Sequence, residues 1–266
     1  MTPETFAHIP QGPFLRFILS LADDELVLGH RDSEWTGHAP ILEEDIALSN
    51  IAQDEIGHSL VWLALYEKLS GRSPDSMAFE RSWKDFRCCR LVSYPIGDFA
   101  YTVTRQYLFD AAEQVRLRAL SDSSSSSLRE IAGKLDREEA YHLLHTRGLV
   151  ERLGDATEES HRRMQAALDQ AFPQALGLFE SLDGEEELIA GRVFPGNGAL
   201  RDGWLEEVVP VLNGASLHLP IKKEKQHWVI GCTADEGGRR GKHVEQLKQL
   251  VGDMQMVFRL APSAKW

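Results

Sequence analysis

The sequence contains two copies of a Glu-x-x-His motif, at Glu55–His58 and at Glu139–His142. Residues three positions apart lie about one turn apart on the same face of an α-helix, so both side chains of a copy can bind one metal ion. Carboxylate and imidazole ligands suit iron or manganese better than the thiolate-rich sets of zinc clusters. The two motifs therefore predict a metal centre in which each copy contributes one histidine to one ion.

Two further glutamates lie in apolar helical stripes outside these motifs. Glu25 interrupts the apolar stripe that runs through Phe14–Trp35, and Glu113 interrupts the stripe that runs through Phe99–Leu120. A carboxylate on a core-facing stripe is costly unless it is paired or bound to a metal. The chain order is then Glu, Glu-x-x-His, Glu, Glu-x-x-His, which is the ligand set of ferritin-like di-iron carboxylate bundles.

The spacing and the charge of these residues agree with that reading. The interval from Glu25 to Glu113 nearly equals the interval from Glu55 to Glu139, so two helix pairs repeat. Four carboxylates cancel the charge of two ferrous ions when both imidazoles are neutral. The alternative is ordinary surface charge, which describes most glutamates. We expect Glu55 and Glu139 to bridge the ions and the lone glutamates to be terminal ligands, which gives the set Glu25, Glu55, His58, Glu113, Glu139 and His142.

Three other acids are candidates to orient the motif histidines. A metal-bound histidine needs an acceptor for its second ring N–H. Asp54 and Glu138 each precede a motif glutamate, and Asp110 lies one turn before Glu113. The alternative, a solvated acidic face, stays open for all three.

The elements that must position these residues follow from hydrophobic period and turn residues. We expect an all-α, ferritin-like four-helix bundle with additional C-terminal helices. It forms a single domain over 1–266, with Ser127 capping the fourth bundle helix and the last helix chiefly covering its own bundle. The expected parts are a leader at 1–13, a four-helix core at 14–154 with helices near 14–35, 41–69, 96–120 and 128–153, a packed connection at 72–96, and a helical extension at 155–266 with a less helical part at 214–241 and a last helix near 242–260.

Composition excludes several classes of protein. A net charge of −12 argues against general nucleic-acid binding, which needs basic surface. No apolar run approaches the roughly 20 residues that span a bilayer, and the N-terminus lacks the pattern of a signal peptide. Cys88, Cys89 and Cys232 cannot form a complete disulfide framework, which predicts the reducing cytoplasm. No G-x-G-x-x-G motif or cysteine cluster is present, so we expect electrons to come from a separate reductase.

Several short segments together resemble the phenylacetate-degradation family, and most closely its PaaC-type subunits of phenylacetyl-CoA epoxidase, a ring 1,2-monooxygenase. The resemblance covers nearly the whole chain. The matching segments are Glu34–Pro40, Asp45–Ile51, Asp98–Ala100, Arg105–Tyr107, Phe109–Ala111, Glu139–His142, Gly148, Glu151–Gly154 and the stretch from Gly237 to Trp266.

The resemblance implies a cytoplasmic subunit of a di-iron oxygenase that works in phenylacetate catabolism. Its partners would be a PaaA-type catalytic subunit and a reductase, with an acyl-CoA as substrate. A homodimer stays open. The basic residues Lys222, Lys223, Lys225, Arg239, Arg240 and Lys242 are candidates to meet CoA phosphates, with a solvated cluster as the alternative.

The sequence also departs from the family's usual form. PaaC-type chains are regarded as structural, and known ones have lost several ligands, whereas all six are present here. Two hypotheses therefore stay open: an oxygenase component with a competent di-iron centre, and a scaffold that docks a catalytic partner without chemistry of its own. Ferroxidase or iron storage is a poorer third, because a minimal ferritin needs no long C-terminal extension.

Overall fold

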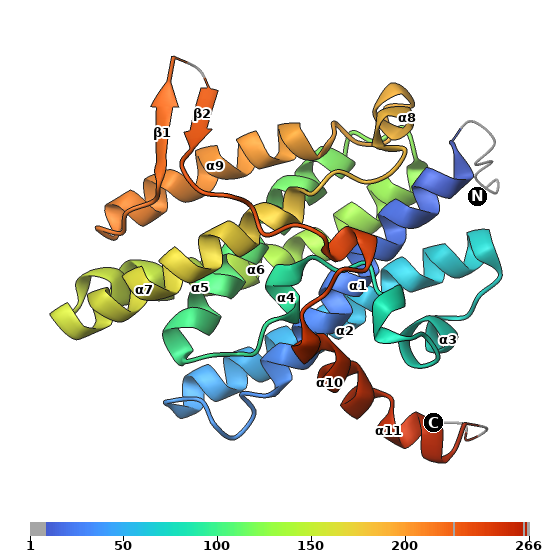
Figure 1. Ribbon diagram of the computed structural model, residues 1–266, viewed down its shortest axis with the longest axis horizontal. Coiled ribbons are helices and arrows are strands. Elements are labelled where there is room, and N and C mark those ends of the chain that lie inside the picture. The colour runs from blue at the N-terminus through green and yellow to red at the C-terminus, as the bar shows by residue number, and fades with distance from the viewer. Residues whose placement is uncertain (1–8, 226, 263, 265–266) are drawn as a thin grey trace. The chain divides into compact units, whose positions relative to one another are not determined.

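The structure is a computed structural model that describes residues 9–225, 227–262 and 264 (Figure 1). Helices dominate it, which confirms the all-α prediction. The four long helices of the expected core are α1 (Gln11–Ser33), α2 (Leu42–Ser70), α5 (Phe99–Leu120) and α6 (Ser126–Asp155). The others are α3 (Pro74–Phe79), α4 (Arg90–Ser93), α7 (Glu158–Leu176), α8 (Glu185–Ala190), α9 (Asn197–Gly214), α10 (Glu245–Met254) and α11 (Met256–Leu260), with 3₁₀ turns η2 (Trp83–Asp85), η3 (Gly177–Phe179) and η4 (Gly238–Arg240).

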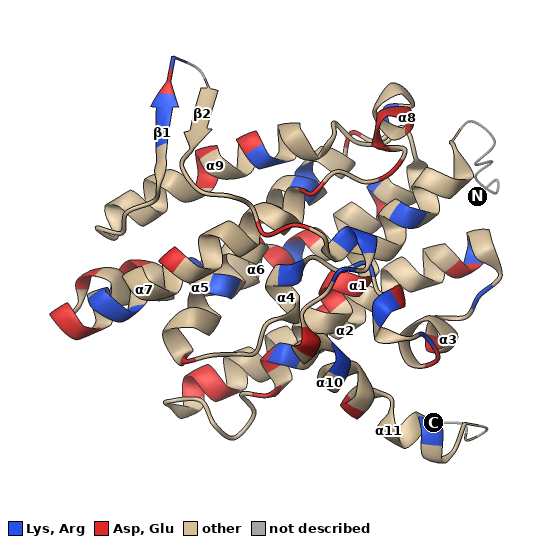
Figure 2. Cartoon of the chain, in the orientation of Figure 1, with Lys and Arg blue, Asp and Glu red and all other residues tan. Residues whose placement is uncertain are grey.

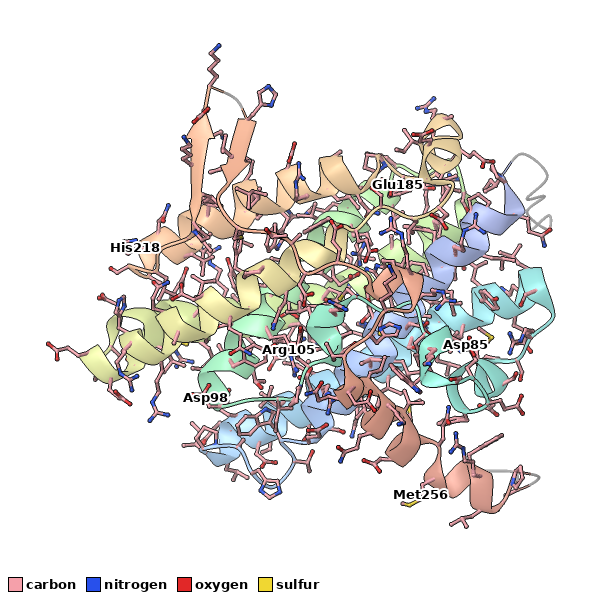
Figure 3. The ribbon with its side chains drawn as sticks, viewed as in Figure 1. Asp85, Asp98, Arg105, Glu185, His218 and Met256 are labelled. Carbon is pink, nitrogen blue, oxygen red and sulfur yellow. The ribbon has the colours of Figure 1, made fainter. Side chains whose placement is uncertain are left out.

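Local signals set the ends of the long helices. Gly71 ends α2 in the left-handed conformation, where glycine carries no steric penalty, at φ 75°. The Asp98 side chain caps α5 by accepting a hydrogen bond from the Tyr101 amide at 2.9 Å (Figure 3). Ser125, not Ser127, caps α6, because the helix starts at Ser126 and places Ser127 inside its first turn. The predicted cap was wrong, although the predicted helix is present.

The chain divides into two compact units, and each is described by itself. Unit 1 consists of Ile96–Glu236 with the segment that ends at Pro13. Within it α5 packs against α6, α7 and α9, which lie side by side in Figure 1. Almost every residue of α5 is buried, as expected of a helix that is covered on all faces. The indole of Trp204 on α9 donates to the carbonyl of Leu108 at 3.0 Å and stacks on Phe172 of α7.

Unit 2 consists of Phe14–Pro95 and Gly237–Trp266, and α1 and α2 form its core. The two helices approach closely at Gly29, where a Cβ atom would lie 2.9 Å from the Ala52 carbonyl oxygen. The Ser59 hydroxyl on α2 donates to the Ala22 carbonyl on α1 at 2.8 Å. Glycine at this contact allows the α1 and α2 backbones to pack tightly.

The connection after α2 is packed, as predicted. It contains α3, η2 and α4, and Phe86, Leu91 and Val92 are fully buried. This part of unit 2 therefore contributes buried apolar side chains to its core.

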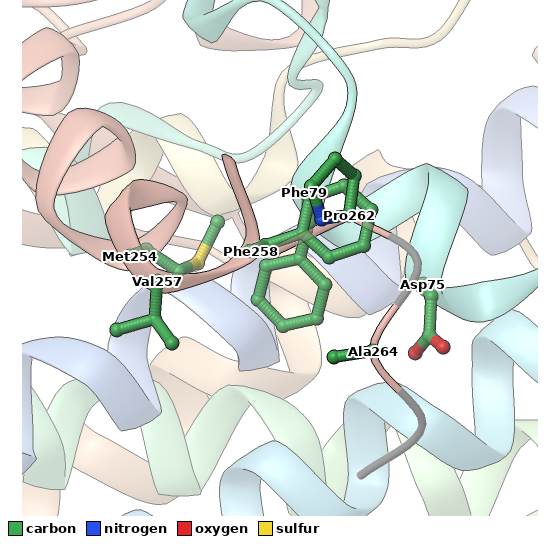
Figure 4. A pocket seen from close by; sticks show the side chains of 7 residues that line it. All are labelled: Asp75, Phe79, Met254, Val257, Phe258, Pro262 and Ala264. Atoms are coloured by element: carbon green, nitrogen blue, oxygen red, sulfur yellow. The ribbon is translucent and has the colours of Figure 1, made fainter. Parts of the chain in front are cut away.

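The C-terminal helix was predicted as one continuous segment, but the structure breaks it at Gln255. The Gln255 side chain is buried and donates to the Arg81 carbonyl at 2.8 Å, and α11 follows at once. Phe258 on α11 stacks on Phe79 of α3 with ring centroids 5.5 Å apart. Both rings line a pocket of about 760 Å³ together with Asp75, Met254, Val257, Pro262 and Ala264 (Figure 4).

Residues 214–241 hold a small hairpin that the sequence analysis did not predict. Strands β1 (Ile221–Glu224) and β2 (His227–Ile230) pair antiparallel, and β1 carries two of the lysines of the predicted basic cluster (Figure 2). The strands are only four residues long, so alternation gave too weak a signal. Within the described residues, no helix combines the length and apolar character needed to cross a bilayer. Residues 1–8 of the predicted leader lie outside the described part of the chain, and α1 starts at Gln11.

Candidate metal centre

Unit 2 brings three of the predicted ligands together, and we call them the α1/α2 half-site: Glu25, Glu55 and His58. Each is at most 1% exposed. One ligand atom from each lies within 4.8 Å of the others. Within the motif, His58 Nδ1 lies 4.0 Å from a Glu55 carboxylate oxygen. Three buried donors this close can share one cation.

Unit 1 holds the second motif on α6 and two acids on α5, and we call Asp110, Glu113, Glu139 and His142 the α5/α6 half-site. All four are buried. His142 Nδ1 lies 3.8 Å from a Glu139 carboxylate oxygen, close to the spacing in the first motif. Asp110 and His142 offer ligand atoms within 4.8 Å of each other. The two Glu-x-x-His motifs therefore have a similar spacing between imidazole and carboxylate.

Asp110 is held in place by two neighbours. The Thr146 hydroxyl on α6 donates to one carboxylate oxygen at 2.6 Å, and the Gln106 amide on α5 donates to the other at 2.8 Å. Thr146 lies one turn after His142, so the same buried face of α6 carries the candidate ligand His142 and the hydroxyl that donates to Asp110. Of the three acids predicted to orient a histidine, Asp110 is buried beside one, Asp54 is half-buried and Glu138 is exposed.

Glu113 forms a buried ion pair with Arg116 on the same helix. The sequence analysis missed this cation. The spacing of three residues on a helix carried the signal, because it places both side chains on one face. A metal ion at Glu113 would compete with the guanidinium for the same carboxylate.

Buried arginines of unit 2 have other partners. Arg81 pairs with Asp23 at 2.9 Å and Arg239 pairs with Asp24 at 2.7 Å, so both cations lie on acids that precede Glu25. The prediction that Arg239 could meet a CoA phosphate was wrong, because its side chain is buried and bound to Asp24.

The donor set of both half-sites, carboxylate oxygen with imidazole nitrogen, fits iron or manganese.

The family model described as phenylacetic acid catabolic protein matches residues 4–266. The chain belongs to this family. It is also 34% identical over 251 residues to one of the subunits of 1,2-phenylacetyl-CoA epoxidase from Escherichia coli (strain K12), across 94% of this chain and 98% of that relative. Both findings confirm the resemblance drawn from the sequence, and the helical content agrees with the ferritin-like fold expected of phenylacetic acid catabolic proteins.

Proposed function

We propose that this chain is a subunit of a phenylacetyl-CoA epoxidase and that its two half-sites together hold a di-metal centre. The observation that carries the proposal is the shared geometry of the two buried motifs, with His Nδ1 to Glu Oε2 distances of 4.0 and 3.8 Å. A buried Glu-x-x-His motif on each of two helices is the ligand arrangement of ferritin-like di-iron bundles. The 34% identity to an epoxidase subunit supports the substrate class.

In this proposal each ligand has a defined role. Glu55 and Glu139 bridge the ions, Glu25 and Glu113 are terminal, and the two motif histidines bind one ion each. The four long helices form one ferritin-like core within 14–154, preceded by the leader at 1–13 and followed by the extension at 155–266. The metal is iron, with manganese as the alternative, since the same ligands suit both.

When bound, the metal pair supplies redox chemistry with dioxygen for oxygen insertion into an aromatic ring. The chain's own residues bind the ions and exclude water, because the motif side chains are at most 1% exposed. Asp110 is fixed by Thr146 and Gln106, and in this proposal it would accept a hydrogen bond from a ring N–H of His142. That contact would fix the tautomer and the orientation of the ring.

The partners follow from the relative's role as one component of an epoxidase. We expect a PaaA-type catalytic subunit and a separate reductase, with the acyl-CoA bound by the assembly. The three cysteines are free thiols, which suits a reducing cytoplasm.

A scaffold is the second candidate, and one observation favours it. The Arg116–Glu113 ion pair places a cation on an expected ligand, as in a centre that has lost part of its metal function. In that case the chain docks the catalytic subunit and its half-sites serve stability alone.

Metal content tests the proposal. After anaerobic loading with ferrous iron, the wild-type chain should hold up to two ions, and Glu55→Ala and Glu139→Ala should lose them. Glu67→Ala and Glu130→Ala remove exposed acids from α2 and α6 and serve as matched controls. Iron content that is unchanged in both motif variants overturns the di-metal proposal.

Turnover separates the oxygenase from the scaffold. The isolated chain should oxidise little phenylacetyl-CoA with NADPH, because it lacks a flavin or iron–sulfur motif. Co-expressed with a PaaA-type subunit and supplied with reductase, a Glu55→Ala complex that still co-elutes on size exclusion should lose activity if this chain's centre is catalytic. Full activity in that complex identifies the scaffold.

A further inference from the structure

Three consecutive acids in the middle of α1, Asp23, Asp24 and Glu25, are all at most 1% exposed. Successive residues of an α-helix point about 100° apart, so these carboxylates fan over roughly 200° around the helix axis. Only Glu25 belongs to the half-site. The two aspartates therefore contact structure on other sides of α1.

Each aspartate is bound by an arginine fork and by one backbone amide. Arg239 donates to both oxygens of Asp24, at 2.8 and 2.7 Å, and the Cys89 amide adds a third bond at 2.7 Å. Arg81 likewise donates to both oxygens of Asp23, and the Arg87 amide adds a bond at 2.7 Å. Three donors on each carboxylate leave little freedom in its position.

The segment Gly237–Gly241 delivers Arg239 into this site. A Cβ atom on Gly238 would collide with the Cys88 carbonyl, and one on Gly241 would collide with the Lys84 carbonyl. Gly237 and Gly241 also have positive φ, at 117° and 73°. The glycines thus allow this turn to pack against the 84–88 backbone, where Arg239 also donates to the Arg87 carbonyl at 3.0 Å. A further hydrogen bond joins Arg239 to the Ser20 carbonyl on α1 at 3.2 Å.

Buried ion pairs add little net stability compared with apolar side chains of similar volume. A bidentate arginine–carboxylate pair does fix orientation. A rotation of α1 by about 20° would move a group about 5 Å from the helix axis by about 2 Å. Metal–ligand distances tolerate only about 0.2 Å. The two arginine–aspartate pairs therefore hold α1 on two sides. This suits a helix that must keep one metal ligand in an accurate position.

We propose that Arg239 is a positioning residue for Glu25: with Arg81, it fixes the rotation of α1 through the two aspartates that precede the ligand. The inference rests on the proposed metal centre. It gives the Gly237–Gly241 turn a role in metal binding although the turn lies more than 200 residues after Glu25 in the sequence.

The test uses Co²⁺ as the probe, because its ligand-field absorption reports coordination geometry, and compares affinity with melting temperature. The double variant Asp24→Leu/Arg239→Met removes both charges and keeps the site filled, so its melting temperature should fall less than that of Arg239→Met alone, although the Cys89 amide loses its acceptor. We expect its Co²⁺ affinity to stay at least about tenfold below wild type, with an altered spectrum. Leu247→Ala, in the buried face of α10, should lower the melting temperature without lowering the affinity.

Wild-type affinity and spectrum in the double variant overturn the positioning role. If the double variant does not fold, Arg239→Lys decides the matter, since it keeps the charge and loses the fork. A wild-type spectrum in Arg239→Lys then overturns the role, and a changed spectrum at a near-normal melting temperature supports it. Glu25→Ala separates the proposed metal centre from the positioning role of Arg239. If wild type binds no Co²⁺, or if Glu25→Ala binds it normally, the metal centre is wrong and the positioning role is wrong with it.

Discussion

The two half-sites share a motif and its local geometry, but they differ in where their buried arginines bind. In unit 2, Arg81 and Arg239 bind Asp23 and Asp24, the residues before the candidate ligand Glu25. In unit 1, Arg116 binds the candidate ligand Glu113 itself. In unit 2 the arginines neutralise and orient the aspartates that precede the candidate ligand. In unit 1 the arginine neutralises the candidate ligand itself, which is the charge that a metal ion would otherwise balance.

The origin of these arginines differs as well. Arg116 lies three residues from its partner on one helix, whereas Arg81 and Arg239 come from 58 and 215 residues away. A local pair forms whenever the helix forms, but the long-range clamps require the whole of unit 2 to fold. We therefore expect two ions that bind unequally, the first at the α1/α2 half-site and the second at the α5/α6 half-site.

The largest effect should come from Arg116→Met. It leaves Glu113 buried without its cation, so the metal-free chain should lose about 3–5 kcal/mol of unfolding free energy. Loading with iron should restore most of that loss, because the ion replaces the guanidinium. Urea unfolding with and without iron measures it, and Arg118→Met, at an exposed pair on the same helix, is the control. A loss that iron does not restore shows that Glu113 is no ligand.

Glu25→Ala and Glu113→Ala compare the half-sites directly. Removing Glu25 should weaken the first ion by about 100-fold, or about 2.7 kcal/mol, since even outer partners of ligands contribute 10–100-fold. Removing Glu113 should cost less than about tenfold, because Arg116 already occupies that carboxylate. Anaerobic ferrous titration gives both values, and equal losses contradict the asymmetry.

Gly29→Ala tests the close approach of α1 and α2. The new Cβ would meet the Ala52 carbonyl and the Ile56 side chain at 2.9 Å, so we expect about 1–3 kcal/mol of destabilisation and weaker binding of the first ion. Gly133→Ala and Gly148→Ala are the controls on α6, where a Cβ meets no atom within 4 Å. They should stabilise the chain by up to about 1 kcal/mol. If Gly29→Ala also stabilises the chain, the close approach of α1 and α2 does not require glycine at this position.

Acid should loosen unit 2 through His243, with a small effect. Burial lowers the pKa of His243, although its hydrogen bond to the Phe86 carbonyl opposes the shift. The neutral ring is stabilising above the unfolded pKa of about 6.5, and that contribution is lost as pH falls from there through the lower folded value. Unfolding free energy of wild type should drop below about pH 6.5 more steeply than that of His243→Gln. Parallel pH profiles contradict this.

The sequence predicted the features that depend on helical period. The six ligand positions and the long helices follow from apolar stripes with an ionisable residue in the middle, and the structure buries all six ligands. The sequence did not predict which buried acid pairs with which buried arginine. Arg239 was placed in a basic cluster that could meet CoA phosphates or be solvated, because a charge in a glycine-rich turn says nothing about depth, and its pairing with Asp24 was not predicted. The break at Gln255 and the β1–β2 hairpin depend on single tertiary contacts and short strands, which leave little trace in periodicity.

The most direct test of the di-metal centre is an anomalous-scattering map at the iron edge, from crystals of the iron-loaded wild-type chain. We expect two peaks in the interior, one coordinated by His58 and the other by His142, with Glu55 and Glu139 between them and the peak near Glu113 the weaker. A map with no interior peak, or with iron only at exposed acids, contradicts the centre.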